Sequence, residues 1–314
     1  MAYIFARKDQ DMKNTKLKGN LMMLLTAFLW GISFISQSKG VENLSPVAFN
    51  GIRSILGGLV LLPVIFFFRP KEKISKNLIM GGIVCGVLLC IASTLQSIGM
   101  VETSPGKAGF ITALYMIIVP IIGLFIGKRP SKAVTAAVIV AVISLYLMCV
   151  KKGEQIVNGD ILVLICAFVF AGHILAIDYF SPKADGVKLA CIQFFVCGII
   201  DLIWAFIFDM DNISFQKVTD CWLAIGYSGI FSCGVAYTLQ MVVQKYTDPT
   251  SASILMSLES VFATLATVIL VALGWDLTGG QMDERQIIGC VLMFVAILLV
   301  QLPDKKTAVI SKEM

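Results

Sequence analysis

Charged residues are scarce in this chain of 314 residues. Asp, Glu, Lys and Arg together make up 14% of it, whereas an ordinary soluble domain carries about 25%. Hydrophobic residues make up 58%, and the mean hydropathy is +0.88. These values exclude a soluble globular fold. The net charge of +5 does not indicate a nucleic-acid partner, because the basic residues lie in short loops between apolar runs.

Several common site motifs are also missing. The only histidine is His173, which excludes a metal site with several histidine ligands. Nine cysteines form no Cys-x-x-Cys pair, and eight of them lie within apolar runs, so we interpret them as packing residues. The sequence has no P-loop, His-Glu-x-x-His or Gly-rich dinucleotide motif. We therefore expect no metal, no cofactor and no nucleotide-driven activity.

Long apolar runs dominate the chain instead. Each run is close to the ~20 residues that cross ~30 Å of hydrocarbon. We predict an all-α membrane protein with ten transmembrane helices, at roughly 20–38, 46–68, 78–100, 106–127, 133–150, 160–179, 187–208, 222–244, 249–273 and 286–302. No small-residue cleavage site follows the first run, so we expect a retained helix and not a signal peptide.

The distribution of Lys and Arg predicts the orientation. With ten spans, 18 of these residues fall on the side of the two termini and 6 on the other side. The positive-inside rule then places both termini in the cytoplasm and the protein in the cytoplasmic membrane. Residues 1–18 are expected to form a disordered cytoplasmic tail and residues 303–314 a second tail. Either Met1 or Met12 is a plausible natural start.

An internal repeat is the most informative pattern. Leu95, Gln96, Thr103, Pro105 and Ala108 recur 144 residues later as Leu239, Gln240, Thr247, Pro249 and Ala252. A second match at an offset of 140 relates Gly19, Leu24, Ala27 and Phe28 to Gly159, Leu164, Ala167 and Phe168. We predict two five-helix repeats, 19–150 and 159–302. Because five is odd, the second repeat crosses the membrane in the opposite direction.

Two inverted repeats are the architecture of many secondary transporters, whose binding sites lie near the midplane between the repeats. We therefore expect alternating-access transport of a small organic solute, powered by an ion gradient, an exchanged solute or the solute's own gradient. Protons are a candidate coupling ion, and a homodimer is left open. A helical scaffold without transport is an alternative, but it gives no reason for the inverted repeat.

The chain resembles the EamA-type permeases of the drug/metabolite transporter superfamily over residues 19–302. The resemblance rests on the order and spacing of four stretches: Leu29-Trp30-Gly31, Phe49 to Arg53, Thr103-Ser104-Pro105 and Ser257 to Phe262. The Gly-Glu pair common after the fourth and ninth helices is replaced here by Gly127-Lys128 and Gly274-Trp275. The resemblance implies transport of metabolites, amino acids among them, or of drug-like compounds, without naming the solute.

Glu259 is the first candidate site residue. It lies ten residues into the ninth span, about 15 Å deep, where a carboxylate is costly and usually faces a cavity or a partner. It could carry a proton, contact a cationic group of the solute, or form a structural hydrogen bond. Tyr115 is its equivalent at the 144-residue offset, so both residues are expected to line one cavity, unless Tyr115 is only a packed aromatic.

Four further residues complete the predicted site. Arg53 in the second span is expected either to bind an anionic group or to point outward and pair with an acid such as Glu102. Gln96 and Gln240 belong to the repeat signature and hydrogen-bond either the solute or a neighbouring helix. Trp30 is expected to cap the cavity or to pack in the core.

Asp201 and His173 are secondary candidates, because the sequence offers no evident partner for either. Gly226-Tyr227-Ser228-Gly229 resembles the nucleophile segment of rhomboid-type intramembrane serine proteases, with His173 as the conceivable base. His173 precedes the serine, opposite to the order in that family. We therefore expect no enzyme activity and keep the protease as an alternative.

Overall fold

The computed structural model describes residues 2–69, 74–125, 127, 130–149, 155–210, 213–274 and 283–301. Over these ranges the secondary structure is helical, with no strand. The helices of the first half are α1 (Ala2–Asn43), α2 (Pro46–Phe68), α3 (Lys76–Gly99), α4 (Pro105–Ala113), α5 (Tyr115–Phe125) and α6 (Lys132–Cys149). Those of the second half are α7 (Asn158–Phe180), η1 (Ser181–Lys183), α8 (Gly186–Phe208), α9 (Phe215–Asp220), α10 (Trp222–Tyr227), η3 (Ser228–Tyr237), α11 (Thr238–Gln244), α12 (Pro249–Met256), α13 (Glu259–Ala272) and α14 (Glu284–Gln301).

Within the described residues, eight helical segments are long and apolar enough to cross a membrane. They are Leu17–Asn43, Pro46–Phe68, Lys76–Gly99, Pro105–Phe125, Asn158–Lys183, Gly186–Phe208, Trp222–Gln244 and Pro249–Ala272. Lys132–Leu147 within α6 is apolar but shorter. Large apolar side chains are exposed along these helices, as lipid contact requires: Phe66, Phe125, Ile203, Phe206 and Leu223 are more than half exposed. The chain is a multi-pass membrane protein.

The first helix differs from the expectation at its start. α1 begins at Ala2 and so includes most of residues 1–18, for which a disordered tail is predicted. The segment before Gly19 contains no proline or glycine, so nothing in its sequence interrupts the helix that continues into the apolar run.

Short polar residues followed by proline start several helices. Ser45, Ser104 and Asp248 precede Pro46, Pro105 and Pro249, and their side chains accept hydrogen bonds from the backbone amides of Ala48, Lys107 and Ser251. Such caps satisfy amides that the first turn leaves unpaired, and proline at the first helical position has no amide to lose. α4 and α12 therefore begin at equivalent positions of the two repeats.

Both of the helices that follow these caps are interrupted near their middle. α4 gives way to α5 at Leu114, and α12 gives way to α13 at Leu258, 144 residues later. At each break the backbone tightens: Leu114 N bonds to Ile111 O at 3.2 Å, and Leu258 N to Leu255 O at 3.4 Å. The sequence predicts one continuous span at 106–127 and another at 249–273, and the structure shows a break within each.

The eighth span departs from α-helix in another way. Its middle, η3, is a π-helix of ten residues between α10 and α11. Such segments are rare and occur often at functional sites. The corresponding part of the first repeat lies in α3, which is a regular α-helix from Lys76 to Gly99.

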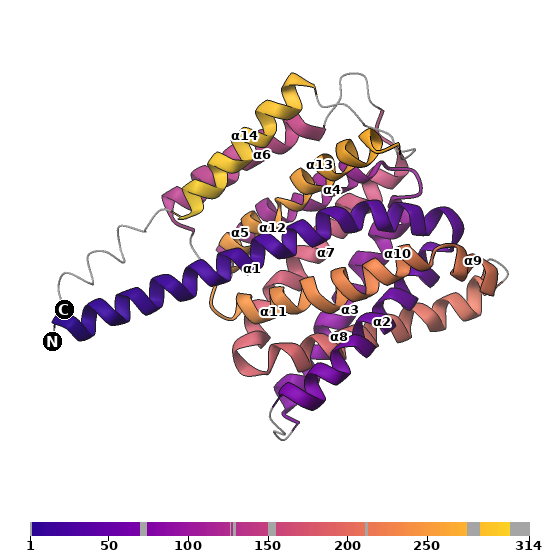
Figure 1. The fold of residues 1–314 in the computed structure, drawn as a ribbon, viewed down its shortest axis with the longest axis horizontal. Coiled ribbons are helices and arrows are strands. Elements are labelled where there is room, and N and C mark those ends of the chain that lie inside the picture. The colour runs from indigo at the N-terminus through magenta and orange to yellow at the C-terminus, as the bar shows by residue number, and fades with distance from the viewer. Residues whose placement is uncertain are drawn as a thin grey trace.

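The two halves of the chain are packed into each other. α1 contacts α13, α2 contacts α8, and α3 contacts α7, so each of these pairs joins one repeat to the other. α6 and α14 pair along one edge of the bundle, as Figure 1 shows. Gly31 in α1 allows one close approach, because an added Cβ would lie 2.8 Å from the carbonyl oxygen of Glu259. The contact between α1 and α13 therefore includes the backbone of Glu259.

Candidate functional site

A cavity lies between the repeats, and about 430 Å³ of its region, open solvent included, is free of protein atoms. The six principal candidates all line it, together with one of the two secondary candidates: Trp30, Arg53, Gln96, Tyr115, Gln240, Glu259 and His173. They come from α1, α2, α3, α5, α7, α11 and α13, so elements of both halves build the wall. The structure therefore brings together residues that are as much as 229 positions apart.

Tyr115 and Glu259 contact each other directly. The Tyr115 hydroxyl donates a hydrogen bond to Glu259 Oε1 at 3.0 Å. Each is the first residue after the break in its helix, and each is 3% exposed. Residues at equivalent positions thus meet where the two interrupted helices approach each other.

Arg53 is buried in α2 and lines the cavity. Its Nε donates to Asn50 Oδ1 at 2.9 Å, and its Cζ lies 5.8 Å from the centre of the Phe49 ring. Glu102, the partner considered for an outward-pointing Arg53, accepts a hydrogen bond from Gly159 N at 3.0 Å. The two residues do not pair, and Arg53 faces inward.

Several polar groups of the cavity wall are buried without a protein partner. Gln96 Nε2 donates to Thr112 Oγ1 at 2.9 Å, a bond between helices. Trp30 Nε1, Gln37 Oε1 and Gln240 Oε1, in contrast, have no hydrogen-bond partner within the part of the chain that the structure describes. Because an unpaired buried polar group is costly, these three atoms are ready to bind a polar ligand or water.

His173 has a partner that the sequence did not reveal. Its Nε2 lies 2.8 Å from Gln193 Oε1, and Gln193 is the equivalent of Arg53 at the 140-residue offset. Ser228, the serine of the protease alternative, pairs with Ser36, with 3.0 Å between the two hydroxyl oxygens. Ser228 and His173 form no hydrogen bond with each other, so the structure does not assemble the required nucleophile and base.

Asp201 lies outside the residues that line the cavity, in a buried cluster behind Arg53. Its carboxyl group accepts hydrogen bonds from Thr94 Oγ1 at 2.8 Å and from Asn50 Nδ2, so the expectation that it has no evident partner is wrong. Cys90, Cys197 and Asp201 place their ligating atoms within 4.8 Å of one another. This is a conceivable metal-ligand set, but hydrogen bonds already occupy both Asp201 oxygens.

Further residues that the sequence did not single out also line the cavity: Phe34, Gln37, Thr112, Ile174, Ser232 and Tyr237. Helical spacing could have found most of them. Phe34 and Gln37 follow Trp30 by four and seven positions, Thr112 precedes Tyr115 by three, and Tyr237 precedes Gln240 by three, which is the spacing of residues on one face of a continuous α-helix. The Tyr237 ring packs 4.6 Å from that of Trp30, measured between ring centres.

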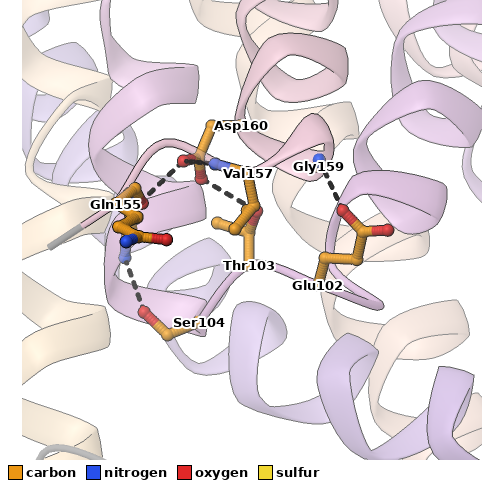
Figure 2. A network of polar contacts seen from close by, with 8 residues as sticks. Glu102, Thr103, Ser104, Gln155, Val157, Gly159 and Asp160 are labelled. Atoms are coloured by element: carbon orange, nitrogen blue, oxygen red, sulfur yellow. Dashed lines mark hydrogen bonds and ion pairs between the residues drawn. The ribbon is translucent and has the colours of Figure 1, made fainter.

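A polar network closes one end of the contact between the repeats (Figure 2). Lys107 Nζ lies 2.7 Å from Asp160 Oδ2, and Thr103 Oγ1 donates to Asp160 Oδ1 at 3.0 Å. Lys107 also donates to the Gln155 carbonyl at 3.0 Å. Side chains at the start of α4 are thus tied to the segment that begins α7.

The chain matches known proteins along nearly its whole length. An uncharacterized transporter from Archaeoglobus fulgidus is 29% identical over 288 residues, which cover 91% of this chain and 87% of that protein. An S-adenosylmethionine/S-adenosylhomocysteine transporter from Chlamydia muridarum is 29% identical over 91 residues, which are 29% of either chain. One crystal structure has the same fold, with a TM-score of 0.73 and 16% identity over 92% of this chain and 98% of that one.

The family comparison agrees with these relatives. The EamA-like transporter family matches residues 17–150 and, a second time, residues 157–302. Both matched segments contribute to the cavity, and the helix breaks at Leu114 and Leu258 lie at the same place in each. The chain belongs to the EamA-like transporter family.

Proposed function

We propose that this protein is a secondary transporter that carries a small organic solute across the cytoplasmic membrane through the cavity between its repeats. In this proposal the chain crosses the membrane ten times as two inverted five-helix repeats, and both termini lie in the cytoplasm. The bond between Tyr115 and Glu259 is the main support, because equivalent residues meet there at matching helix breaks inside a cavity. Interrupted helices at corresponding positions are typical of transporter binding sites.

The wall of the cavity suits a solute with both polar and planar parts. Arg53 and Glu259 offer opposite charges, and Trp30 and Tyr237 offer stacked aromatic faces. The unpaired atoms of Trp30, Gln37 and Gln240 add one donor and two acceptors. An amino acid, an amino-acid derivative or a drug-like compound has this combination of groups.

Alternating access follows from the arrangement of the repeats. The network around Lys107 and Asp160 closes one end of the contact between them, which the predicted orientation places at the outer face. For the solute to leave there, this network has to open while the equivalent contact at the other end closes. Two repeats of opposite orientation make both states accessible at similar energy.

Glu259 is the residue that we assign to coupling. A buried carboxyl group within the membrane either exchanges a proton during the cycle or binds a cationic group of the solute. Tyr115 holds this carboxyl group at 3.0 Å in the present conformation. A solute group that binds Glu259 competes with this hydrogen bond, so binding is linked to the contact between the two helix breaks.

The proposal is tested with purified protein in two stages. A thermal-shift screen over amino acids, nucleosides, polyamines, cationic dyes and S-adenosylmethionine identifies stabilising solutes, and transport of a labelled hit into liposomes is then measured. We expect Glu259→Gln to lose most of the transport and its pH dependence, and Tyr115→Phe to retain part of both. Full transport with unchanged pH dependence in Glu259→Gln would rule out the coupling role. Absence of transport for every solute that binds would rule out the carrier.

A further inference from the structure

In the buried cluster behind Arg53, several hydrogen-bond donors surround the carboxyl group of Asp201. Asp201 in α8 accepts two hydrogen bonds on its carboxyl group, from Thr94 in α3 and Asn50 in α2. Cys90 and Cys197 also direct their thiols at the two oxygens, at 3.3 Å and 3.6 Å. An ionised carboxylate only accepts hydrogen bonds, so four surrounding donors are the arrangement that this form requires.

Asn50 connects this carboxylate to Arg53. Its Nδ2 faces Asp201 and the hydroxyl of Ser93, which is 2.9 Å away, and its Oδ1 accepts from Arg53 Nε at 2.9 Å. The amide cannot turn over without directing its NH₂ group at the Arg53 N–H. Asp201 therefore fixes which atom of Asn50 faces Arg53, and Asn50 is fully buried.

Arg53 retains its remaining donors for the cavity. A guanidinium group has five N–H donors, and Asn50 takes one of them. Over the described residues, Arg53 makes no other hydrogen bond or ion pair, and its side chain lines the cavity. Arginine binds carboxylates with two parallel N–H donors when its plane is held in place.

We propose that Asp201 and Asn50 are positioning residues that hold Arg53 as a carboxylate-binding group of the cavity. The inference rests on the proposed function, since it assigns one chemical group, a carboxylate, to the transported solute. Asp201 does not touch the solute. Through Asn50 it orients the free donors of the guanidinium group, so the empty site is preorganised.

Anion binding at Arg53 can be measured without knowing the solute. The protein has five arginines, and ¹⁵N-arginine labelling with an Arg53→Lys variant assigns the Nε–H signal of Arg53. We expect sodium benzoate to shift this signal to saturation, whereas benzamide, which has nearly the same shape and no charge, leaves it in place. No shift with benzoate, or equal shifts with both compounds, would overturn the proposal.

Asp201→Asn tests the positioning role. We expect benzoate to bind about tenfold more weakly, and the Arg53 Nε–H to exchange with water at least about tenfold faster, because a hydrogen bond to a charged group is lost. Thr94→Val removes one donor to Asp201 with little change of volume and should weaken binding about threefold, which keeps the test open if Asp201→Asn does not fold. Affinity equal to that of the unmodified protein in the folded variants would contradict the role.

A matched control and the transport assay complete the design. Asp220 is exposed in α9, where it accepts a bond from Gln216, so Asp220→Asn should leave both NMR properties unchanged. If benzoate binds at Arg53 but no solute crosses liposomes, the proposed transport fails and the carboxylate site stands. If a solute is transported but the Arg53 signal does not respond to benzoate, the carboxylate assignment alone fails.

Discussion

The two ends of the contact between the repeats use equivalent positions, but they close to different degrees. At one end, a Cβ added to Gly159 would lie 2.7 Å from Thr103 Oγ1. At the other end, a Cβ added to Gly19 would lie 3.9 Å from Thr247 Oγ1. These glycines and threonines correspond at the offsets of 140 and 144 residues. The two repeats therefore pack closely against each other at one end, the tight end, and less closely at the other, the looser end.

The side chains around the glycines explain the difference. Lys107 and Asp160 form an ion pair at the tight end, while their equivalents, Ser251 and Asn20, are uncharged. A serine and an asparagine cannot form an ion pair, so the asymmetry is already present in the sequence. The repeats therefore share their backbone fold and differ in the interactions that hold each end closed.

Breaking the ion pair between Lys107 and Asp160 should lower the stability of the protein the most. Asp160→Ala removes the acceptor for Lys107, Thr103 and the Val157 amide at once. We expect the free energy of unfolding in mixed detergent micelles to fall by about 2–4 kcal/mol, because a largely buried charge loses its partner.

A double variant sharpens this test by giving the tight end the residues of the other end. Lys107→Ser with Asp160→Asn leaves no charge unpaired, so it should cost less than Asp160→Ala alone. A double variant at least as unstable as the single one would show that the ion pair is not the reason for the tightness.

Replacing Gly159 or Gly19 by alanine should lower the free energy of unfolding by a smaller amount, and the loss should differ between the two ends. Gly159→Ala places a Cβ against the backbone of Gly99 and the Thr103 side chain, and should cost about 1–3 kcal/mol of unfolding free energy. Gly19→Ala meets its nearest atom, Val243 Cγ1, at 3.3 Å, and should cost less than about 1 kcal/mol. Equal losses in the same unfolding experiment would mean that the two ends are packed alike.

Much of the site could be predicted from the repeat. Gln96 and Gln240 recur in register, and the same offset pairs Tyr115 with Glu259, which the structure places in contact. Most of the remaining candidates are polar or ionisable residues in the middle of an apolar span, where their burial in the membrane is energetically costly. The internal repeat of the sequence therefore indicates which residues share a cavity.

Features that depend on packing between distant helices could not be predicted. Asp201 has its partners in α2 and α3, more than 100 positions away, and no local pattern marks them. The breaks at Leu114 and Leu258 occur in spans that are as apolar as the regular ones, and no proline marks the π-helix at Ser228–Tyr237. Local propensity does not determine such departures, because neighbouring helices stabilise them.

Reversible cross-linking of the tight end tests whether transport requires this end to open. Thr103→Cys and Asp160→Cys replace residues whose side-chain oxygens lie 3.0 Å apart, and a short, cleavable bifunctional thiosulfonate can join them in liposomes. Each variant with only one of the two introduced cysteines, beside the nine native ones, is the control for the reagent. We expect cross-linking to stop transport of the solute found in the screen, and reduction to restore it. Transport at the full rate through the cross-linked protein would contradict this expectation.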